Sequence, residues 1–199
     1  MPQELILASG SEIRAKLLTQ ARIPHRIDPA RIDEEAVRGA LEAEEAKPRD
    51  IADTLAELKA RKISDKHPEA TVLGCDQVLA LGNTVFGKAA ERQDAVEHLS
   101  QLSGQTHMLL SAAVIVEAGQ PTWRHVGVVR LTMHSLSRDF IEGYLDRNWP
   151  DVQSSVGGYK IEGEGVRLFS RIQGDHFSIL GLPLLEFMNH LILKGELAT

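Results

Sequence analysis

Segments typical of strands alternate with segments typical of helices along the chain. The apolar run Leu5–Ser9 stops at Gly10-Ser11, and the apolar positions that follow repeat at helical spacing. Over 50–62, apolar residues again share one helical face, and a buried-strand pattern over 71–81 comes next. This alternation predicts a fold of the α/β class.

The second half continues the alternation. Gly82-Asn83 is expected to turn the strand back, and a helix is predicted over 92–102. Two apolar, β-branched stretches over 107–133 flank Gly119-Gln120-Pro121, which predicts a long antiparallel hairpin. Another helix is expected near 137–148, and a Gly-rich stretch follows it.

The last helix has the clearest pattern of all. Its apolar residues repeat at i, i+3, i+4, i+7 and i+8, and they are Leu184, Phe187, Met188, Leu191 and Ile192. No repeat, low-complexity tract or linker divides the sequence. We therefore expect a single domain over residues 1–199.

The first turn of the chain suits an anion. A strand, a Gly-Ser turn and a helix aim free backbone N–H groups at one point, with Ser9 in the turn and Ser11 as a plausible N-cap. Arg14 lies in the first helical turn, where a cation opposes the helix dipole unless an anion offsets the repulsion. The alternatives are an ordinary capped helix and a solvated arginine.

Three carboxylates are candidates for a capping or functional role. Asp33 comes just before a predicted helix and is expected to cap it, which leaves Glu34 for another role. Asp76 lies inside an apolar run, where an unpaired carboxylate is costly to bury. It must pair with a cation, bind a metal or face a cleft. The neighbouring Cys75 is read as a small core residue.

Two lysines are candidates for binding phosphate. Lys59 shares a helix with an apolar stripe, so the base of its side chain lies near the buried face. Lys88 follows a glycine that permits close approach of a ligand. The ordinary alternative for both is extension into solvent. The histidines form no HxxxH or HxH pair, so no zinc site is expected.

Composition narrows the class of protein. The 199 residues are 43% hydrophobic and 25% charged, as in globular proteins. One cysteine excludes a disulfide framework and fits a reducing compartment, so we expect a cytoplasmic protein. No apolar run is long enough to span a membrane, and a net charge of −6 argues against nucleic-acid binding. A small anionic ligand stays compatible with that charge.

The motifs, taken together, resemble the Maf family of nucleoside triphosphate pyrophosphatases. The resemblance spans nearly the whole chain in collinear order. The segments that carry it are Leu7–Leu18, Asp33-Glu34, Leu55–Ala60, Gly74–Gln77, Phe86–Lys88, Leu102–His107, Gly157–Gly163, Ile172–Gly174 and Gly181–Pro183.

The resemblance implies a two-lobed α/β fold on a long, bent mixed sheet, related to the inosine triphosphate pyrophosphatases, with a cleft between the lobes. It implies hydrolysis of a nucleoside triphosphate to the monophosphate and pyrophosphate with Mg²⁺ or Mn²⁺, and it allows a homodimer. The implied roles are Asp76 as proton acceptor and metal ligand, Glu34 as metal ligand, and Ser9, Arg14, Lys59 and Lys88 as phosphate contacts. Ile13, Gln77 and Glu162 would face the base.

Two features of the sequence bear on the substrate. Glu12 and Ile13 stand where the family usually has Pro and a first Arg. Gln77 and Glu162 are more similar to the YceF-like branch, associated with 7-methyl-GTP, than to the dTTP/UTP branch. Two other functions are kept open: a nucleotide-binding regulator of cell division with weak or no catalysis, and a house-cleaning enzyme that prefers deaminated purines.

Overall fold

The computed structural model describes residues 4–198. Its strands are β1 (Leu5–Leu7), β2 (Arg26–Ile27), β3 (Thr71–Leu81), β4 (Thr84–Phe86), β5 (Thr106–Glu117), β6 (Gln120–Met133) and β7 (Phe169–Gln173). Its α-helices are α1 (Glu12–Gln20), α2 (Glu34–Ala43), α3 (Pro48–Ser64), α4 (Arg92–Leu102), α5 (Arg138–Asn148), α6 (His176–Ile179) and α7 (Leu184–Leu193). Short 3-10 helices cover Asp151–Ser154 and Glu164–Leu168.

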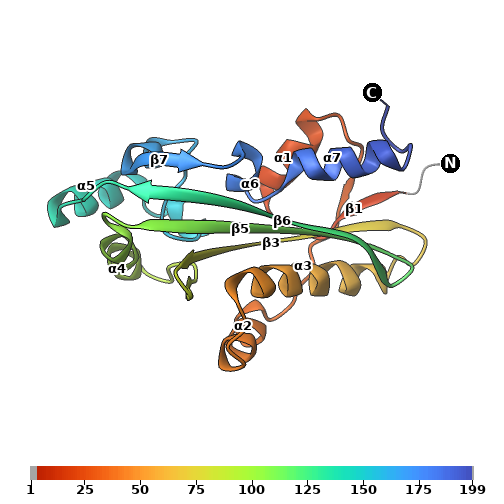
Figure 1. The fold of residues 1–199 in the computed structure, drawn as a ribbon, viewed down its shortest axis with the longest axis horizontal. Helices are drawn as coiled ribbons and strands as arrows, with labels where there is room; N and C mark the ends of the chain where they lie inside the picture. The colour runs from red at the N-terminus through yellow and green to blue at the C-terminus, as the bar shows by residue number, and fades with distance from the viewer. Residues whose placement is uncertain (1–3, 199) are drawn as a thin grey trace. The chain divides into compact units, whose positions relative to one another are not determined.

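Within these residues the strands form one seven-stranded mixed sheet in the order β2-β1-β3-β5-β6-β7, with β4 paired to β3 (Figure 1). Strand β1 is parallel to both β2 and β3, whereas β4 is antiparallel to β3 and β7 is antiparallel to β6. A two-residue turn joins β5 to β6, so these neighbours form an antiparallel hairpin. The α/β class is confirmed.

The chain divides into two compact units. One holds residues 4–77, 110–127 and 175–198 of the described chain, and the other holds 78–109 and 128–174. Three of the boundaries fall within β3, β5 and β6, and the fourth falls between β7 and α6.

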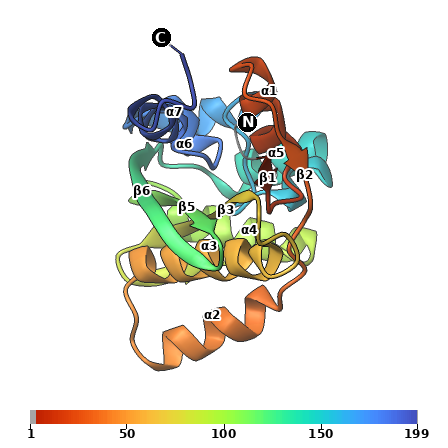
Figure 2. The same cartoon turned by 90° about the vertical axis from the view of Figure 1, so that its right-hand side faces the viewer.

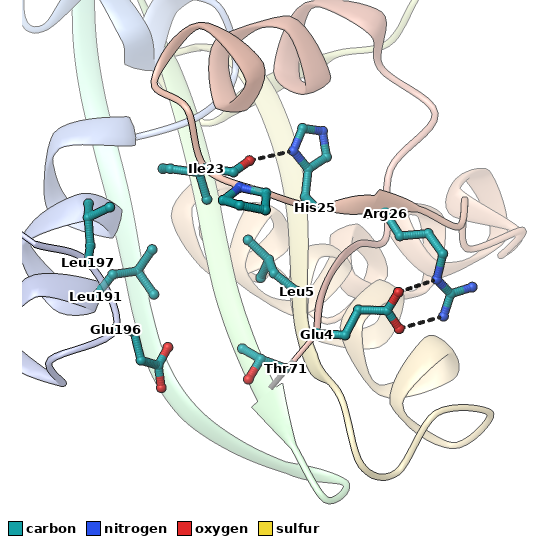
Figure 3. A pocket seen from close by; sticks show the side chains of 10 residues that line it. Glu4, Leu5, Ile23, His25, Arg26, Thr71, Leu191, Glu196 and Leu197 are labelled. Atoms are coloured by element: carbon teal, nitrogen blue, oxygen red, sulfur yellow. Dashed lines mark hydrogen bonds and ion pairs between the residues drawn. The ribbon is translucent and has the colours of Figure 1, made fainter. Parts of the chain in front are cut away.

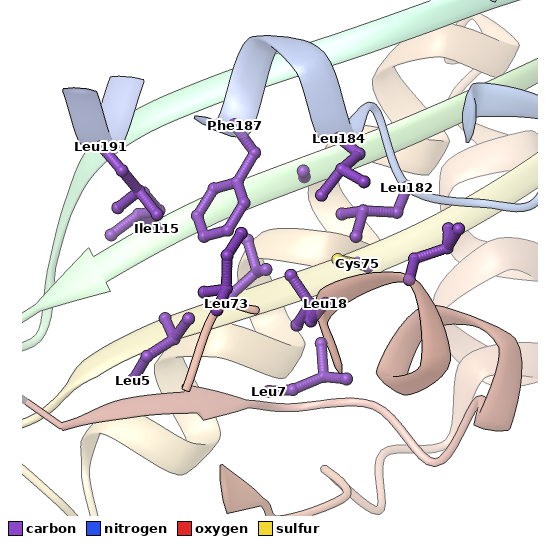
Figure 4. Packing of buried hydrophobic residues seen from close by; sticks show 13 residues of the cluster. Leu5, Leu7, Leu18, Leu73, Cys75, Ile115, Leu182, Leu184, Phe187 and Leu191 are labelled. Atoms are coloured by element: carbon purple, nitrogen blue, oxygen red, sulfur yellow. The ribbon is translucent and has the colours of Figure 1, made fainter. Parts of the chain in front are cut away.

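In the first unit, helices cover both faces of the strands. Helix α3 lies on one face and α1 and α7 lie on the other, while α2 lies beyond α3, away from the strands (Figure 2). Leu5 and Leu7 on β1 belong to the core beneath α1 and α7, together with Leu73 and Phe187 (Figure 4). Ile6 is buried as well. A strand that is apolar on both faces is typical of the interior of an α/β fold.

Most predicted elements are found where the pattern placed them. Strand β3 and helix α4 have the predicted bounds, and α3 begins two residues before the predicted 50–62 helix. The hairpin turn is Ala118-Gly119, so Gln120 and Pro121 are the first residues of β6 rather than part of the turn. Proline is tolerated there because the start of a strand can lack one ladder hydrogen bond.

Two strands, β2 and β7, were not predicted. Strand β2 has only two residues, both exposed, and most of β7 is exposed as well. Neither strand has the run of apolar residues from which the sequence predicts buried strands. Among the described residues, no helix is long and apolar enough to cross a membrane.

Candidate active site

One buried cation holds two carboxylates in the first unit. Lys59 Nζ lies 2.7 Å from Asp76 Oδ1 and 2.9 Å from Glu34 Oε1. Lys59 and Asp76 are each 6% exposed, whereas the Glu34 side chain is 41% exposed. Of the three alternatives for Asp76, the structure shows pairing with a cation, and Lys59 does not extend into solvent. The three residues come from α2, α3 and β3.

A glycine brings α3 close enough to β3 for this pairing. A Cβ atom on Gly74 would lie 2.1 Å from the backbone oxygen of Ala56 and 2.8 Å from the Cβ of Ala60. Only a residue without a side chain allows that approach. Asp76 lies two residues further along the strand and therefore points to the same face as Gly74. The close contact sets Lys59 opposite Asp76.

The charged groups near Asp76 shift its pKa in opposite directions. Burial raises the pKa of Asp76 above the ordinary range of an aspartate, and the ammonium of Lys59 partly offsets this effect. The nearby carboxylate of Glu34 raises that pKa further. A buried carboxylate with a raised pKa is a common feature of proton-transferring sites. The neighbouring Cys75 is fully buried, and burial raises the pKa of its thiol to about 11, in agreement with a core role.

Arg14 is a buried structural donor as well as a cation. Its Nε donates to the Gly181 carbonyl oxygen at 2.7 Å, and its Nη1 lies 3.0 Å from Ser9 Oγ and 3.1 Å from the Cys75 carbonyl oxygen. The side chain is 9% exposed, so the reading as a solvated arginine is wrong. These hydrogen bonds connect α1 to the turn after β1, to β3 and to the segment before α7.

The turn at Ser9 leads into α1 as predicted. Ser11 occupies the N-cap position of α1 with extended backbone angles, but its side chain makes no capping hydrogen bond. Instead the Ser11 N–H donates to Ser9 Oγ at 3.3 Å. The N-terminal amides of α1 therefore have no capping side chain, which is the arrangement that an anion can satisfy.

Two of the residues expected to face the base, Ile13 and Gln77, lie in the first unit. The Gln77 Nε2 lies 2.9 Å from Ser111 Oγ, 3.1 Å from the Ser178 carbonyl oxygen and 2.9 Å from the Ile179 carbonyl oxygen. Its two N–H groups are therefore satisfied within the protein, and the amide oxygen is the group left to meet a ligand. Ile13 is half-buried in the first turn of α1.

The other predicted residues, Lys88 and Glu162, lie in the second unit. Both side chains are exposed. The backbone of Lys88 forms an isolated antiparallel bridge with Val156. Glu162 lies in the turn between Tyr159 and the second 3-10 helix. The first unit thus brings together Ser9, Arg14, Glu34, Lys59 and Asp76, and the second unit carries Lys88 and Glu162.

The residues present fit a divalent cation that binds together with phosphates. Among the described residues, no group of three or more His, Cys, Asp or Glu side chains is arranged to hold a metal by itself. Glu34 and Asp76 nevertheless converge on one point, the ammonium of Lys59. Mg²⁺ is commonly held by one or two carboxylates and completes its coordination with water and substrate phosphates.

A separate cavity of about 440 Å³ lies elsewhere in the first unit (Figure 3). Apolar side chains such as Leu5 and Leu191 line it, and the Arg26–Glu4 ion pair lies at its edge. None of the predicted site residues lines this cavity. Its lining holds no buried charged pair comparable to Lys59 and Asp76, so it carries none of the predicted chemistry.

Comparisons with known proteins cover nearly the whole chain. A family model described as Maf-like protein matches residues 4–193. A nucleoside triphosphate pyrophosphatase of Ruegeria pomeroyi is 60% identical over 199 residues, which cover 100% of both chains. One of Roseobacter denitrificans is 60% identical over 197 residues, 99% of each chain. A 7-methyl-GTP pyrophosphatase of Mesorhizobium japonicum is 45% identical over 197 residues, again 99% of each.

Proposed function

Because this chain belongs to the Maf family, we propose that it is a nucleoside triphosphate pyrophosphatase, which hydrolyses a nucleoside triphosphate to the monophosphate and pyrophosphate. Relatives that are 60% identical over essentially the whole chain bear that name. The structural observation that carries the proposal is the buried Lys59 ammonium between the carboxylates of Asp76 and Glu34.

In the proposed reaction, water attacks the α-phosphorus and the bond between that phosphorus and the bridging oxygen to the β-phosphorus breaks. Asp76 accepts the proton of the attacking water as general base. The pyrophosphate leaves with the bonding electron pair, so negative charge develops on its oxygens. Lys59 lies within 2.7 Å of the base and supplies a nearby positive charge that stabilises the leaving group.

Glu34 and Asp76 are proposed to hold Mg²⁺ or Mn²⁺ together with the triphosphate. The metal would neutralise phosphate charge and polarise the phosphoryl oxygens. Ser9 and the N-terminal amides of α1 would bind a phosphate directly. Arg14 would act mainly by fixing the turn that presents them, since its Nε and Nη1 already donate to protein oxygens. The proposed phosphate contact of Lys88 rests on the motif Phe86-Gly-Lys88.

For the base, we propose a guanine nucleotide, including N7-methylated forms. An ionised Glu162 can only accept hydrogen bonds, and guanine offers N1–H and N2–H₂ side by side. Uracil and thymine instead present carbonyl oxygens on both sides of a single N–H, which a carboxylate repels. Relatives at 45% and 47% identity are named 7-methyl-GTP pyrophosphatases, which supports this choice. The single cysteine and the acidic composition support a cytoplasmic location for the proposed enzyme.

A pyrophosphate-release screen tests the proposal. Purified protein is incubated with common and N7-methylated nucleoside triphosphates, with and without Mg²⁺ or Mn²⁺, and pyrophosphate and monophosphate are quantified. We expect metal-dependent release of both products in equal amounts. Release of inorganic phosphate alone, or tight nucleotide binding without turnover, would overturn the assignment, and the second result would favour a nucleotide-binding regulator.

A further inference from the structure

His107 is a buried titratable residue that the proposed chemistry does not use. It lies on β5 and is 0% exposed. Its Nε2 and the Oη of Tyr159 share a hydrogen bond of 2.8 Å in the second unit. Its Nδ1 is buried and has no hydrogen-bond partner among the described residues. An unpartnered ring nitrogen is costly, and a leucine–phenylalanine pair would fill similar space without that cost.

Tyr159 is a buried residue of the 156–163 loop, which packs against β3 and β7 of the second unit. Its ring packs edge-on against Phe169 with centroids 4.9 Å apart, and it is 4% exposed. Gly157 adopts a positive φ of 78°, and a Cβ there would lie 2.5 Å from Leu79 Cδ1. The same Cβ would lie 2.8 Å from Tyr159 Cε1, so the backbone at Gly157 packs closely against both the Leu79 side chain of β3 and the tyrosine ring.

This anchored loop includes or contacts both predicted site residues that lie in the second unit, Lys88 and Glu162. Val156, three residues before Tyr159, bridges to the backbone of Lys88. Glu162, three residues after Tyr159, is exposed at the end of the loop. A shift of the tyrosine would move the backbone that carries Glu162 and the bridge that supports Lys88.

We propose that His107 and Tyr159 are positioning residues, whose shared hydrogen bond fixes the 156–163 loop and thereby sets the base selectivity exerted through Glu162. Aromatic packing alone lets a ring slide or tilt, whereas a hydrogen bond restricts the tyrosine to one direction. That directional restraint explains why a polar pair is kept in an apolar setting. The expected effect on base selectivity rests on the proposed function. The expected effect on the order of the 156–163 loop does not.

The test compares Tyr159→Phe, which keeps the ring and removes the hydroxyl, with the intact enzyme. Amide hydrogen exchange of residues 156–163 should become at least tenfold faster in the variant. For the preferred guanine nucleotide, KM should rise about tenfold with a smaller change in kcat, and the preference over UTP should fall by a similar factor.

Further variants separate positioning from simple stability. His107→Leu should reproduce the effects of Tyr159→Phe, and His107→Gln, which keeps a hydrogen-bonding group, should restore part of the selectivity. Combining His107→Leu with Tyr159→Phe should add little to either change, because both remove the same hydrogen bond.

Ser103→Ala is a matched control in the same unit. The Ser103 Oγ accepts a hydrogen bond from the Leu136 N–H at 2.7 Å, at a site outside the loop. This variant should lower the melting temperature without altering selectivity or exchange in the loop. Normal exchange and normal base preference in Tyr159→Phe would overturn the inference. Absence of turnover in the intact protein would contradict the proposed function instead, and hydrogen exchange would still test the role of the pair in loop order.

Discussion

The ammonium of Lys59 lies 2.7 Å from the carboxylate of Asp76, and both side chains are buried. Breaking such a pair by removing one partner leaves a buried charge and is usually strongly destabilising. In this protein, however, Glu34 offers Lys59 a second carboxylate at 2.9 Å. The ammonium therefore keeps a partner when Asp76 is neutralised, and the catalytic role of Asp76 can be tested in a folded protein.

Asp76→Asn should keep the fold and nucleotide binding while turnover falls by roughly 10²-fold or more, the scale of a lost general base. Steady-state kinetics and nucleotide titration measure the two effects separately. Asp53→Asn is the matched control, because Asp53 pairs with Arg124 in the same unit and has no place in the proposed site. Near-normal turnover in Asp76→Asn would remove this residue from the mechanism.

Metal and nucleotide should bind the intact protein cooperatively. Without a triphosphate, the Lys59 ammonium lies within 3 Å of an oxygen of each proposed ligand, Glu34 and Asp76, and repels a divalent cation. Calorimetric titration with Mn²⁺ should therefore show weak binding alone and at least about tenfold tighter binding with a non-hydrolysable triphosphate.

Lys59→Met should strengthen binding of Mn²⁺ alone, because it removes the competing charge, and should weaken binding of the triphosphate. Lys62→Met serves as the control: it lies on the same helix, and its ammonium contacts the carbonyl oxygen of Arg31. Equal Mn²⁺ affinity in the intact protein and in Lys59→Met would contradict the proposed competition between the ammonium and the metal ion for the two carboxylates.

Gly74→Ala should destabilise the protein by about 1–3 kcal/mol or more, the usual range for overpacking. The added methyl would overlap the backbone oxygen of Ala56, so α3 must move away from β3 and carry Lys59 with it. Denaturant unfolding and kinetics should both show losses. Gly39→Ala is the control, since a Cβ there meets nothing within 4 Å, and alanine is favoured over glycine in a helix by roughly 0.5–1 kcal/mol. An unchanged free energy of unfolding in Gly74→Ala would show that α3 can move away from β3 with little loss of stability.

Base preference should depend on the charge of Glu162. The intact enzyme should favour guanine nucleotides over UTP and dTTP by roughly tenfold or more, since a hydrogen bond to a charged group contributes about 1.5–3 kcal/mol. Glu162→Gln should relax that preference toward pyrimidines, because an amide both donates and accepts hydrogen bonds. Competition assays with paired substrates measure the ratio directly. Faster hydrolysis of dTTP and UTP by the intact enzyme would refute this account of the base contact while leaving the pyrophosphatase assignment in place.

The protein should lose stability as the pH falls below about 6.5, in part through His107. Burial lowers the pKa of His107 to about 4 in the folded protein, whereas the unfolded chain has an ordinary value near 6.5. Between these values the unfolded state binds more protons, so acidification favours unfolding, by up to roughly 3 kcal/mol at pH 4. Denaturant unfolding from pH 7 to pH 4 should show a flatter profile in His107→Gln. Parallel profiles would assign the acid sensitivity to other groups.

The sequence alone determined the elements whose pattern is local. Strand β3 and helix α4 have their predicted bounds because a continuous apolar run and a helical periodicity are both properties of neighbouring residues. It also limited Asp76 to pairing with a cation, binding a metal or facing a cleft, because an unpaired carboxylate is costly to bury in an apolar run. Strand β7 was missed because most of its side chains are exposed and, within residues 4–198, it pairs with β6 alone.

Tertiary structure alone decided which groups meet. Asp76 could have paired with several cations, and the close approach of α3 at Gly74 selects Lys59. Arg14 donates to Gly181, which is 167 residues away in sequence, and Gln77 donates to carbonyl groups about 100 residues away. No periodicity encodes such partners. They depend on the packing of elements that are distant along the chain, and packing also decides which donors remain available to a ligand.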